Sequence, residues 1–316
     1  MEENNYYLLD INDEIKQSIE NKQFEKTAEL LAEGQHIEEE DVEKAKARLF
    51  FLLGQGFYDG SIGNPKEQEL IDHLQLNQNI DDAISCFESG VKYNSLPCIN
   101  KLFKLYFYAK NGMQNFEKAF KLAKLGAELN DPLLTFRFGT MLFGGKGCEK
   151  NIKKAYECFE KSFQYDAAWG AYELGTQSEY GIMCDVDEKK AFTYYLLGAN
   201  AGDKLSIFKC AAIFSGYFKN KFLFVEPDID TSIKYYEKYL KVEHIRNSKS
   251  LKNLGALLYE HKTGKQKTDG IKKIVKAAKR NEESAINYLK YKTEFGDIQE
   301  EPNQNIVKMQ EMAMSK

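Results

Sequence analysis

The sequence of 316 residues lacks the features by which membrane and secreted proteins are usually identified. No apolar run approaches the length of about 18 residues that a membrane-spanning helix needs. The opening stretch, MEENNYYLLDIN, has neither a basic region nor an apolar core, so we expect no signal peptide. Proline occurs only 5 times and valine is scarce, whereas Leu, Lys, Glu, Ala, Tyr and Phe are plentiful, which favours helices over sheets.

Charge and cysteine content further limit the class of protein to which the chain can belong. The chain is 43% apolar and 29% charged, which is typical of a globular protein rather than a disordered one. Its net charge of −4 is small for this length and indicates neither a nucleic-acid partner nor a membrane surface. No two of the 6 cysteines form a C-x-x-C pair, so we expect free thiols in a cytoplasmic protein: Cys86, Cys98, Cys148, Cys158, Cys184 and Cys210.

Catalytic motifs are also missing, and we expect no cofactor and no metal. The 4 histidines are scattered, and neither H-E-x-x-H nor G-x-S-x-G occurs. The stretch GGKG at residues 144–147 lacks the spacing of a phosphate-binding loop and follows a predicted helix, which indicates a turn between helices. Acids in CDVDE and PDID leave a metal-dependent hydrolase or transferase as one hypothesis, although helix N-caps explain them more simply: Asp185, Asp187, Asp228 and Asp230.

An internal repeat is the dominant positive feature of the sequence. Ala83, Ala119, Ala155 and Ala191 lie 36 residues apart, and Ser232 and Gly270 continue the series at intervals of 41 and 38. The residue four positions before each of the first five anchors is Asn or Asp, which predicts an N-cap at the start of a helix: Asn79, Asn115, Asn151, Asp187 and Asp228.

A second helix is predicted before each cap. It is marked by a Leu-Gly pair or a variant of it, where the small residue lets another helix approach closely: Leu53-Gly54, Phe138-Gly139, Leu174-Gly175, Ala211-Ala212 and Leu254-Gly255. Each unit is therefore a helix, a short turn and a second helix. Such a pair cannot bury its apolar face alone, so it must stack on its neighbours.

The third and fourth copies resemble the Sel-one-like repeat family, a relative of the tetratricopeptide repeats. The fourth copy carries the resemblance in Leu174-Gly175, Gly181, Asp187, Lys190-Ala191, Tyr194-Tyr195, Ala199 and Gly202, and the third supplies Gly145 and Gly147 in its turn. The resemblance covers most of residues 45–290. It implies an all-α, right-handed superhelical solenoid of about six to seven helix-turn-helix repeats.

The expected organisation has three parts. Residues 1–44 contain a degenerate helical pair that caps the array, residues 45–295 form the solenoid, and residues 296–316 are a capping helix or a tail. The first copy departs from the pattern by about 13 extra residues between Gly54 and Ala83.

The resemblance also implies a binding surface, because first helices line the concave face of tetratricopeptide-like solenoids. First-helix residues that point away from the Leu-Gly face are the candidates for that surface: Tyr106, Arg137, Met141, Tyr172, Gln177, Lys209 and Phe214. Aromatic residues, Met and Arg are typical of interaction hot spots. We therefore expect a scaffold or adaptor that binds a protein or peptide. An immunity protein or inhibitor that blocks a partner enzyme or toxin is an alternative by analogy.

Charge is unevenly distributed along the chain. Residues 1–43 contain 14 acids and 3 bases, whereas residues 241–280 contain 12 bases and 3 acids. One interpretation is that both are ordinary solvated helix faces. The other is that the basic end steers an acidic partner through Lys272, Lys273 and Lys276. The sequence does not decide the oligomeric state.

Overall fold

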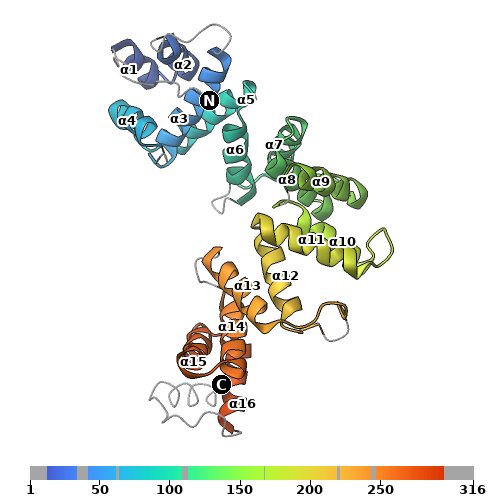
Figure 1. The fold of residues 1–316 in the computed structure, drawn as a ribbon. Coiled ribbons are helices and arrows are strands. Elements are labelled where there is room, and N and C mark those ends of the chain that lie inside the picture. The colour runs from blue at the N-terminus through green and yellow to red at the C-terminus, as the bar shows by residue number, and fades with distance from the viewer. Residues whose placement is uncertain are drawn as a thin grey trace. The chain divides into compact units, whose positions relative to one another are not determined.

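The computed structural model describes residues 13–33, 42–61, 64–108, 113–166, 168–218, 221–242 and 247–294, and within these ranges it contains sixteen helices and no strand (Figure 1). The chain forms two compact units, Met1–Ser162 and Phe163–Lys316. The described residues therefore have the all-α architecture that the sequence predicts.

The first unit holds α1 (Asp13–Glu20), α2 (Phe24–Glu33), α3 (Val42–Tyr58), α4 (Pro65–Leu74), α5 (Ile80–Lys92), α6 (Leu96–Tyr108), α7 (Phe116–Glu128), α8 (Pro132–Gly144) and most of α9 (Ile152–Tyr165). The second holds α10 (Ala171–Tyr180), α11 (Glu188–Ala201), α12 (Lys204–Phe214), α13 (Ile229–Val242), α14 (Ser248–His261), α15 (Gly264–Ala278) and α16 (Glu283–Glu294). Within each unit, helices that follow one another in sequence pack side by side, except that α3 packs on α5 across α4 (Figure 1).

The predicted N-caps are confirmed in all five copies. Each Asn or Asp side chain accepts a hydrogen bond of 2.9–3.0 Å from a backbone N–H two or three residues further on: Asn79, Asn115, Asn151, Asp187 and Asp228. The four anchor alanines and Ser232 are fully buried. The repeat read from the sequence is thus a repeat of helix starts and of helix contacts.

In four of the copies, the glycine of the first helix receives a large side chain from the second helix. A Cβ atom built on any of these glycines would lie 2.4–2.8 Å from the facing side chain, closer than real Cβ contacts: Gly54 faces Phe87, Gly139 faces Phe159, Gly175 faces Tyr195 and Gly255 faces Ile274. The facing residue always lies four positions after the anchor, on the same side of its helix. This contact explains why the sequence needs glycine there.

The glycines of the GGKG stretch form an interhelical turn, as predicted. Gly145 caps α8 with a φ of +65°, in the left-handed region that glycine adopts most easily. Gly147 has a φ of +71°, and a Cβ there would lie 2.1 Å from the carbonyl oxygen of Phe116. The backbone of the neighbouring repeat therefore packs directly against Gly147 and leaves no room for a side chain.

The ends of the repeat array depart from the simple pattern. The extra residues of the first copy include α4, a helix that the repeat did not predict, and its Glu67 forms an ion pair with Arg48 of α3. At the N-terminal end, α1 and α2 precede the array. The predicted C-terminal segment 296–316 lies outside the described residues.

Candidate protein-binding surface

Of the three predicted surface residues in the first unit, Met141 is a core residue. It is 0% exposed, so its assignment to a binding face was wrong. The reason is helical geometry: Met141 lies three positions after Phe138 and therefore shares the buried side of α8. Arg137 is half-buried, and its guanidinium donates to Asn100 and lies 4.7 Å from the ring centroid of Phe103 on α6.

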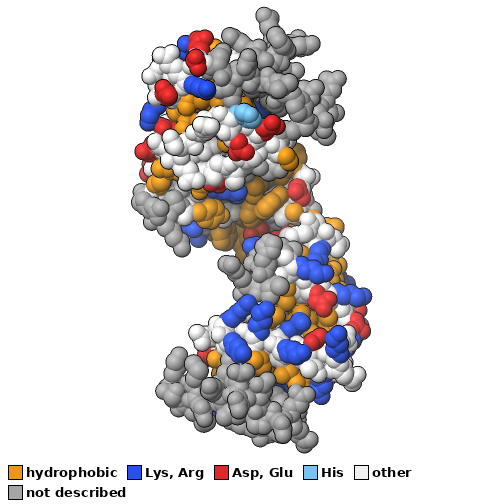
Figure 2. All heavy atoms as spheres, turned by 90° about the vertical axis from the view of Figure 1, so that its left-hand side faces the viewer, with side chains coloured by type: hydrophobic (Ala, Val, Ile, Leu, Met, Phe, Trp, Pro, Cys, Tyr) orange, Lys and Arg blue, Asp and Glu red, His pale blue; other side chains and the backbone are white. Residues whose placement is uncertain are grey.

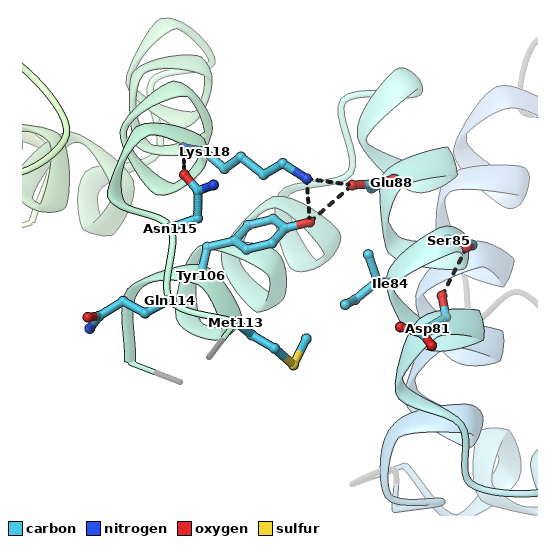
Figure 3. A pocket seen from close by; sticks show the side chains of 9 residues that line it. All are labelled: Asp81, Ile84, Ser85, Glu88, Tyr106, Met113, Gln114, Asn115 and Lys118. Carbon is cyan, nitrogen blue, oxygen red and sulfur yellow. Dashed lines mark hydrogen bonds and ion pairs between the residues drawn. The ribbon is translucent and has the colours of Figure 1, made fainter. Parts of the chain in front are cut away.

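Tyr106 lies at a polar recess of about 470 Å³ between α5, α6 and the start of α7 (Figure 3). Its hydroxyl donates to Glu88 at 3.1 Å and accepts from the ammonium of Lys118 at 3.4 Å. Burial and the neighbouring Glu88 carboxylate raise the pKa of Tyr106. With 7% of its surface exposed and its hydroxyl engaged, Tyr106 contributes little that a partner could contact.

The predicted aromatic residues of the second unit are only partly exposed. The ring of Tyr172 packs 5.8 Å from that of Tyr195, and the ring of Phe214 stacks on Tyr235 at 5.7 Å. Both side chains adjoin the buried core of the unit. The backbone carbonyl of Gln177, also half-buried, accepts from the N–H groups that close the α10–α11 turn. These residues are therefore engaged in contacts within the second unit and lie only partly at its surface.

Lys209 belongs to a buried ion cluster that sequence reasoning did not find. Its ammonium lies 2.7 Å from an oxygen of Glu179, which also accepts from the hydroxyl of Tyr195 at 2.7 Å. The ammonium of Lys221 lies 3.3 Å from the other oxygen. Burial alone would raise the pKa of Glu179, but hydrogen bonds from Lys209 and Tyr195 outweigh it and lower the pKa. The available signal was an acid on the buried stripe of α10, four residues after Gly175.

This cluster fastens the described part of the long α12–α13 loop, residues 215–218 and 221–228, onto the helices beneath it. Lys221 reaches Glu179 of α10, and the next residue, Phe222, donates its backbone N–H to Glu188 of α11 at 3.0 Å. The ring of Phe222 is buried against Phe192 and Tyr195. The loop therefore has a polar and an apolar anchor side by side.

Between and beside these anchors, the loop and the neighbouring α10–α11 turn expose large apolar side chains. Of thirteen such exposed residues in the described ranges, six lie on these two segments or at the adjoining end of α10: Tyr180, Met183, Val186, Tyr217, Leu223 and Phe224. The loop contacts the helices on either side of that turn, because the Lys221 ammonium lies 4.1 Å from the ring of Tyr180 at the end of α10 and the ring of Phe224 lies 5.9 Å from that of Phe192 on α11. We call these six residues the two-turn surface. Clusters of exposed apolar side chains are typical of interaction sites.

Of the four acids considered for a hydrolase or transferase site, three have structural roles, and Asp185 caps no helix. Asp187 and Asp228 are N-caps, and Asp230 pairs with Lys262. Hydrogen bonds from the backbone and hydroxyl of Thr231 lower the pKa of Asp228. Across the described part of the chain, no three His, Cys, Asp or Glu side chains gather closely enough to hold a metal ion.

The lysines predicted to steer a partner lie on α15. Lys272 has a side chain that is 74% exposed, with the carboxylate of Asp269 3.9 Å away, and Lys276 is also exposed, whereas Lys273 is half-buried. Figure 2 shows Lys and Arg side chains gathered on one face of the second unit. Among the described helices, none combines the length and the apolar character that crossing a membrane requires.

Comparison with known families and structures agrees with this architecture. The model of the Sel1 repeat matches residues 97–131, 136–164, 170–203 and 215–238. The fold is similar to that of a protective antigen of uropathogenic Escherichia coli strains displaying an SLR fold, with a TM-score of 0.61 and 15% identity over 88% of this chain. The match spans 62% of the antigen's own length.

A Sel1 repeat protein from Oxalobacter formigenes is similar over 85% of this chain and 99% of its own, with a TM-score of 0.57 and 16% identity. An immunity protein from Pseudomonas aeruginosa superposes with a TM-score of only 0.38, at 16% identity over 75% of this chain and 85% of that chain. A search of curated proteins gives no match.

Proposed function

The chain is a Sel1-like repeat protein with an all-α helical solenoid fold, and from this premise we propose that it is a non-catalytic scaffold or adaptor that binds a protein or peptide partner. The Sel1 repeat fold is generally an interaction fold without catalytic activity. The observation that carries the proposal is the two-turn surface, where two adjacent segments expose six large apolar side chains. We also propose a cytoplasmic location, which the six free cysteines support.

The predicted concave-face residues enter the proposal with a smaller role. Tyr106, Arg137, Tyr172, Gln177, Lys209 and Phe214 are engaged with other side chains or turns, so we propose that they shape the surface of their own units rather than supply affinity for a partner. Lys272, Lys273 and Lys276 remain the proposed steering group for an acidic part of the partner.

Affinity capture followed by calorimetry tests the proposal. The full chain is used as bait beside a Leu223→Ser, Phe224→Ser variant, with Leu205→Ser as a control, because Leu205 is exposed on α12 outside the two-turn surface. We expect a partner that is retained by the wild type and by the control and is lost from the double variant. Reproducible catalytic turnover by the purified chain without any partner would contradict the proposal.

An inhibitor or immunity protein is a narrower form of the same function, since it too binds a partner. Co-expression with a toxic product of an adjacent gene tests it, and the expected result is restored growth. The third hypothesis, a metal-dependent hydrolase or transferase, predicts that divalent ions or nucleotides raise the melting temperature, and a thermal-shift screen decides it.

A further inference from the structure

We propose that the exposed side of α6 docks a partner segment rich in Asp or Glu, with Lys101 and Lys104 binding its carboxylates. We call the side chains of Asn100, Lys101, Lys104 and Tyr108 the α6 surface. The inference rests on the proposed function, because it assumes a protein or peptide partner. It adds a second surface, within the first unit, and names the chemistry of the segment that binds there.

Lys101 is a half-buried cation without a carboxylate partner. Its ammonium lies 3.8 Å from the ring centroid of Tyr58 on α3. Burial lowers the pKa of Lys101, the charge of Asp59 opposes this effect, and the charge of Lys104 adds to it. In the described part of the chain, no carboxylate lies within 4.0 Å of the Lys101 ammonium, and that of Asp59 accepts from Gln55 at 2.7 Å instead. A charge partly removed from water gains from the ring beneath it but lacks an opposite charge to balance it.

Lys104 and Tyr108 continue the surface along α6. They lie four and eight positions after Asn100, on one side of the helix, and both are exposed, Tyr108 to 61%. Among the residues that the structure describes, none pairs its carboxylate with Lys104. From α8, the guanidinium of Arg137 donates to Asn100 and lies over the ring of Phe103. Arg137 therefore shapes this side of the surface and adds to its positive charge.

Bases outnumber acids around the α6 surface. Residues 93–116, which include all of α6, contain three bases and no acid, and the third base, Lys110, lies outside the described residues. One base and no acid belong to α8, and the turn after it places the ammonium of Lys146 4.9 Å from the ring of Phe107. Three bases and one acid belong to α3, and two of these bases pair with acids of α2 and α4.

Two acids act on the cations of this surface without pairing with them. Asp59 partly offsets the effect of burial on the pKa of Lys101, and Asp131 partly offsets that on the pKa of Arg137. Asp131 is the N-cap of α8, and its carboxylate accepts from the backbone N–H of Leu134 at 2.7 Å. The surface therefore keeps an excess of positive charge that an acidic segment would neutralise.

An acidic peptide fits this surface better than a nucleic acid does. Binding to a phosphate backbone depends on many simultaneous contacts with bases, whereas two lysines dominate here. The net charge of −4 on the whole chain also opposes a long polyanion. A short segment with several carboxylates reaches Lys101 and Lys104 together, because residues three positions apart lie on the same side of a helix. The exposed ring of Tyr108 offers an apolar contact beside them.

A pair of synthetic peptides tests the inference with the full chain. The probe is a labelled peptide in which Glu alternates with Ser, and its matched control replaces every Glu by Gln. We expect the Glu/Ser peptide to bind, in fluorescence anisotropy at about 100 mM salt, roughly tenfold or more tightly than the Gln/Ser peptide. Lys101→Met with Lys104→Met should weaken the Glu/Ser peptide by roughly tenfold without lowering the melting temperature, whereas Lys101→Arg with Lys104→Arg should retain binding.

Two controls separate the α6 surface from other lysines. Lys121→Met with Lys153→Met removes the same charge from exposed positions on α7 and α9, and it should leave binding nearly unchanged. The lysines of α15 also attract acids, so the comparison is repeated in a chain that carries Lys272→Met, Lys273→Met and Lys276→Met. The loss caused by the two substitutions on α6 should persist in that chain.

Equal binding of the two peptides, or an equal loss in the Lys121→Met, Lys153→Met control, would overturn the inference. Tighter binding of a single-stranded DNA of the same charge would overturn it too, because the surface would then recognise phosphate. So would self-association that Lys101→Met with Lys104→Met abolishes, since a second copy would then be the occupant. If a captured partner binds this variant as tightly as the wild type, the inference fails and the proposed function stands. If neither the peptide nor any partner binds, both fail.

Discussion

At the scale of single residues, the contact between a first-helix glycine and a ring four positions after the anchor defines the repeat. Gly54 faces Phe87, and a Cβ at Gly54 would lie 2.5 Å from the ring. Neither Gly54 nor Phe87 is unusual on its own, and it is their pairing that identifies the repeat. Where the second copy has no Leu-Gly pair, the position four after its anchor is Ala123 instead of a large side chain.

We predict that Gly54→Ala lowers the free energy of unfolding by about 1–3 kcal/mol, because the added methyl overpacks the Phe87 ring by more than the gain in helix propensity. Gly144→Ala is the matched control, since a Cβ at Gly144 meets nothing closer than 3.6 Å. Urea unfolding measures both variants. Equal midpoints for Gly54→Ala and the wild type would show that the pair is not a tight contact.

A second residue-scale prediction concerns Glu173, whose pKa burial raises to about 7, with a contribution from Asp203. Between pH 4.5 and 7 the unfolded chain loses this proton before the folded one does, so stability falls as pH rises across that window. Glu173→Gln should therefore be neutral near pH 4.5 and stabilise the protein by about 1–3 kcal/mol above pH 7. Thermal melts at both pH values check this, with exposed Glu237→Gln as control. A variant effect that is the same at both pH values would exclude ionisation of Glu173 as its cause.

At the scale of the helix and turn, the sequence predicts those structural features that depend on residues close by in the chain. The cap at Asn151 and the turn at Gly145 depend on residues a few positions away, so their signals are local and repeated. The prediction for Met141 was wrong because it placed this residue on the outer side of α8, whereas a residue three positions after the buried Phe138 lies on the inner side of the helix. The ion cluster joins Glu179 to Lys221 across forty-two residues, and no periodicity encodes that pairing.

The cap prediction can be tested on two acids that differ by two positions. Asp187→Ala should cost about 1 kcal/mol, because the Lys190 N–H loses its acceptor. Asp185→Ala caps nothing and should change stability by less than about 0.5 kcal/mol. Chemical denaturation compares the two. Equal losses in both variants would show that the cap hydrogen bond does not decide the stability of α11.

At the scale of the whole molecule, the second unit presents two surfaces of opposite character. The two turns expose large apolar side chains, whereas α15 exposes lysines such as Lys272 and Lys276. The first kind of surface acts chiefly on how long a complex lasts, and the second on how quickly it forms. A partner that uses both would show two separable kinetic effects, each belonging to one surface.

The final prediction separates those effects. Changing Lys272, Lys273 and Lys276 to Glu should slow association with the captured partner by roughly tenfold at low salt and leave dissociation nearly unchanged. The Leu223→Ser, Phe224→Ser variant should do the reverse and accelerate dissociation. Stopped-flow measurements at about 20 mM and about 500 mM salt compare them, since a steering effect disappears when the Debye length shrinks. If the lysine variant associates as fast as the wild type at low salt, the basic face of α15 is a solvated helix surface and steers nothing.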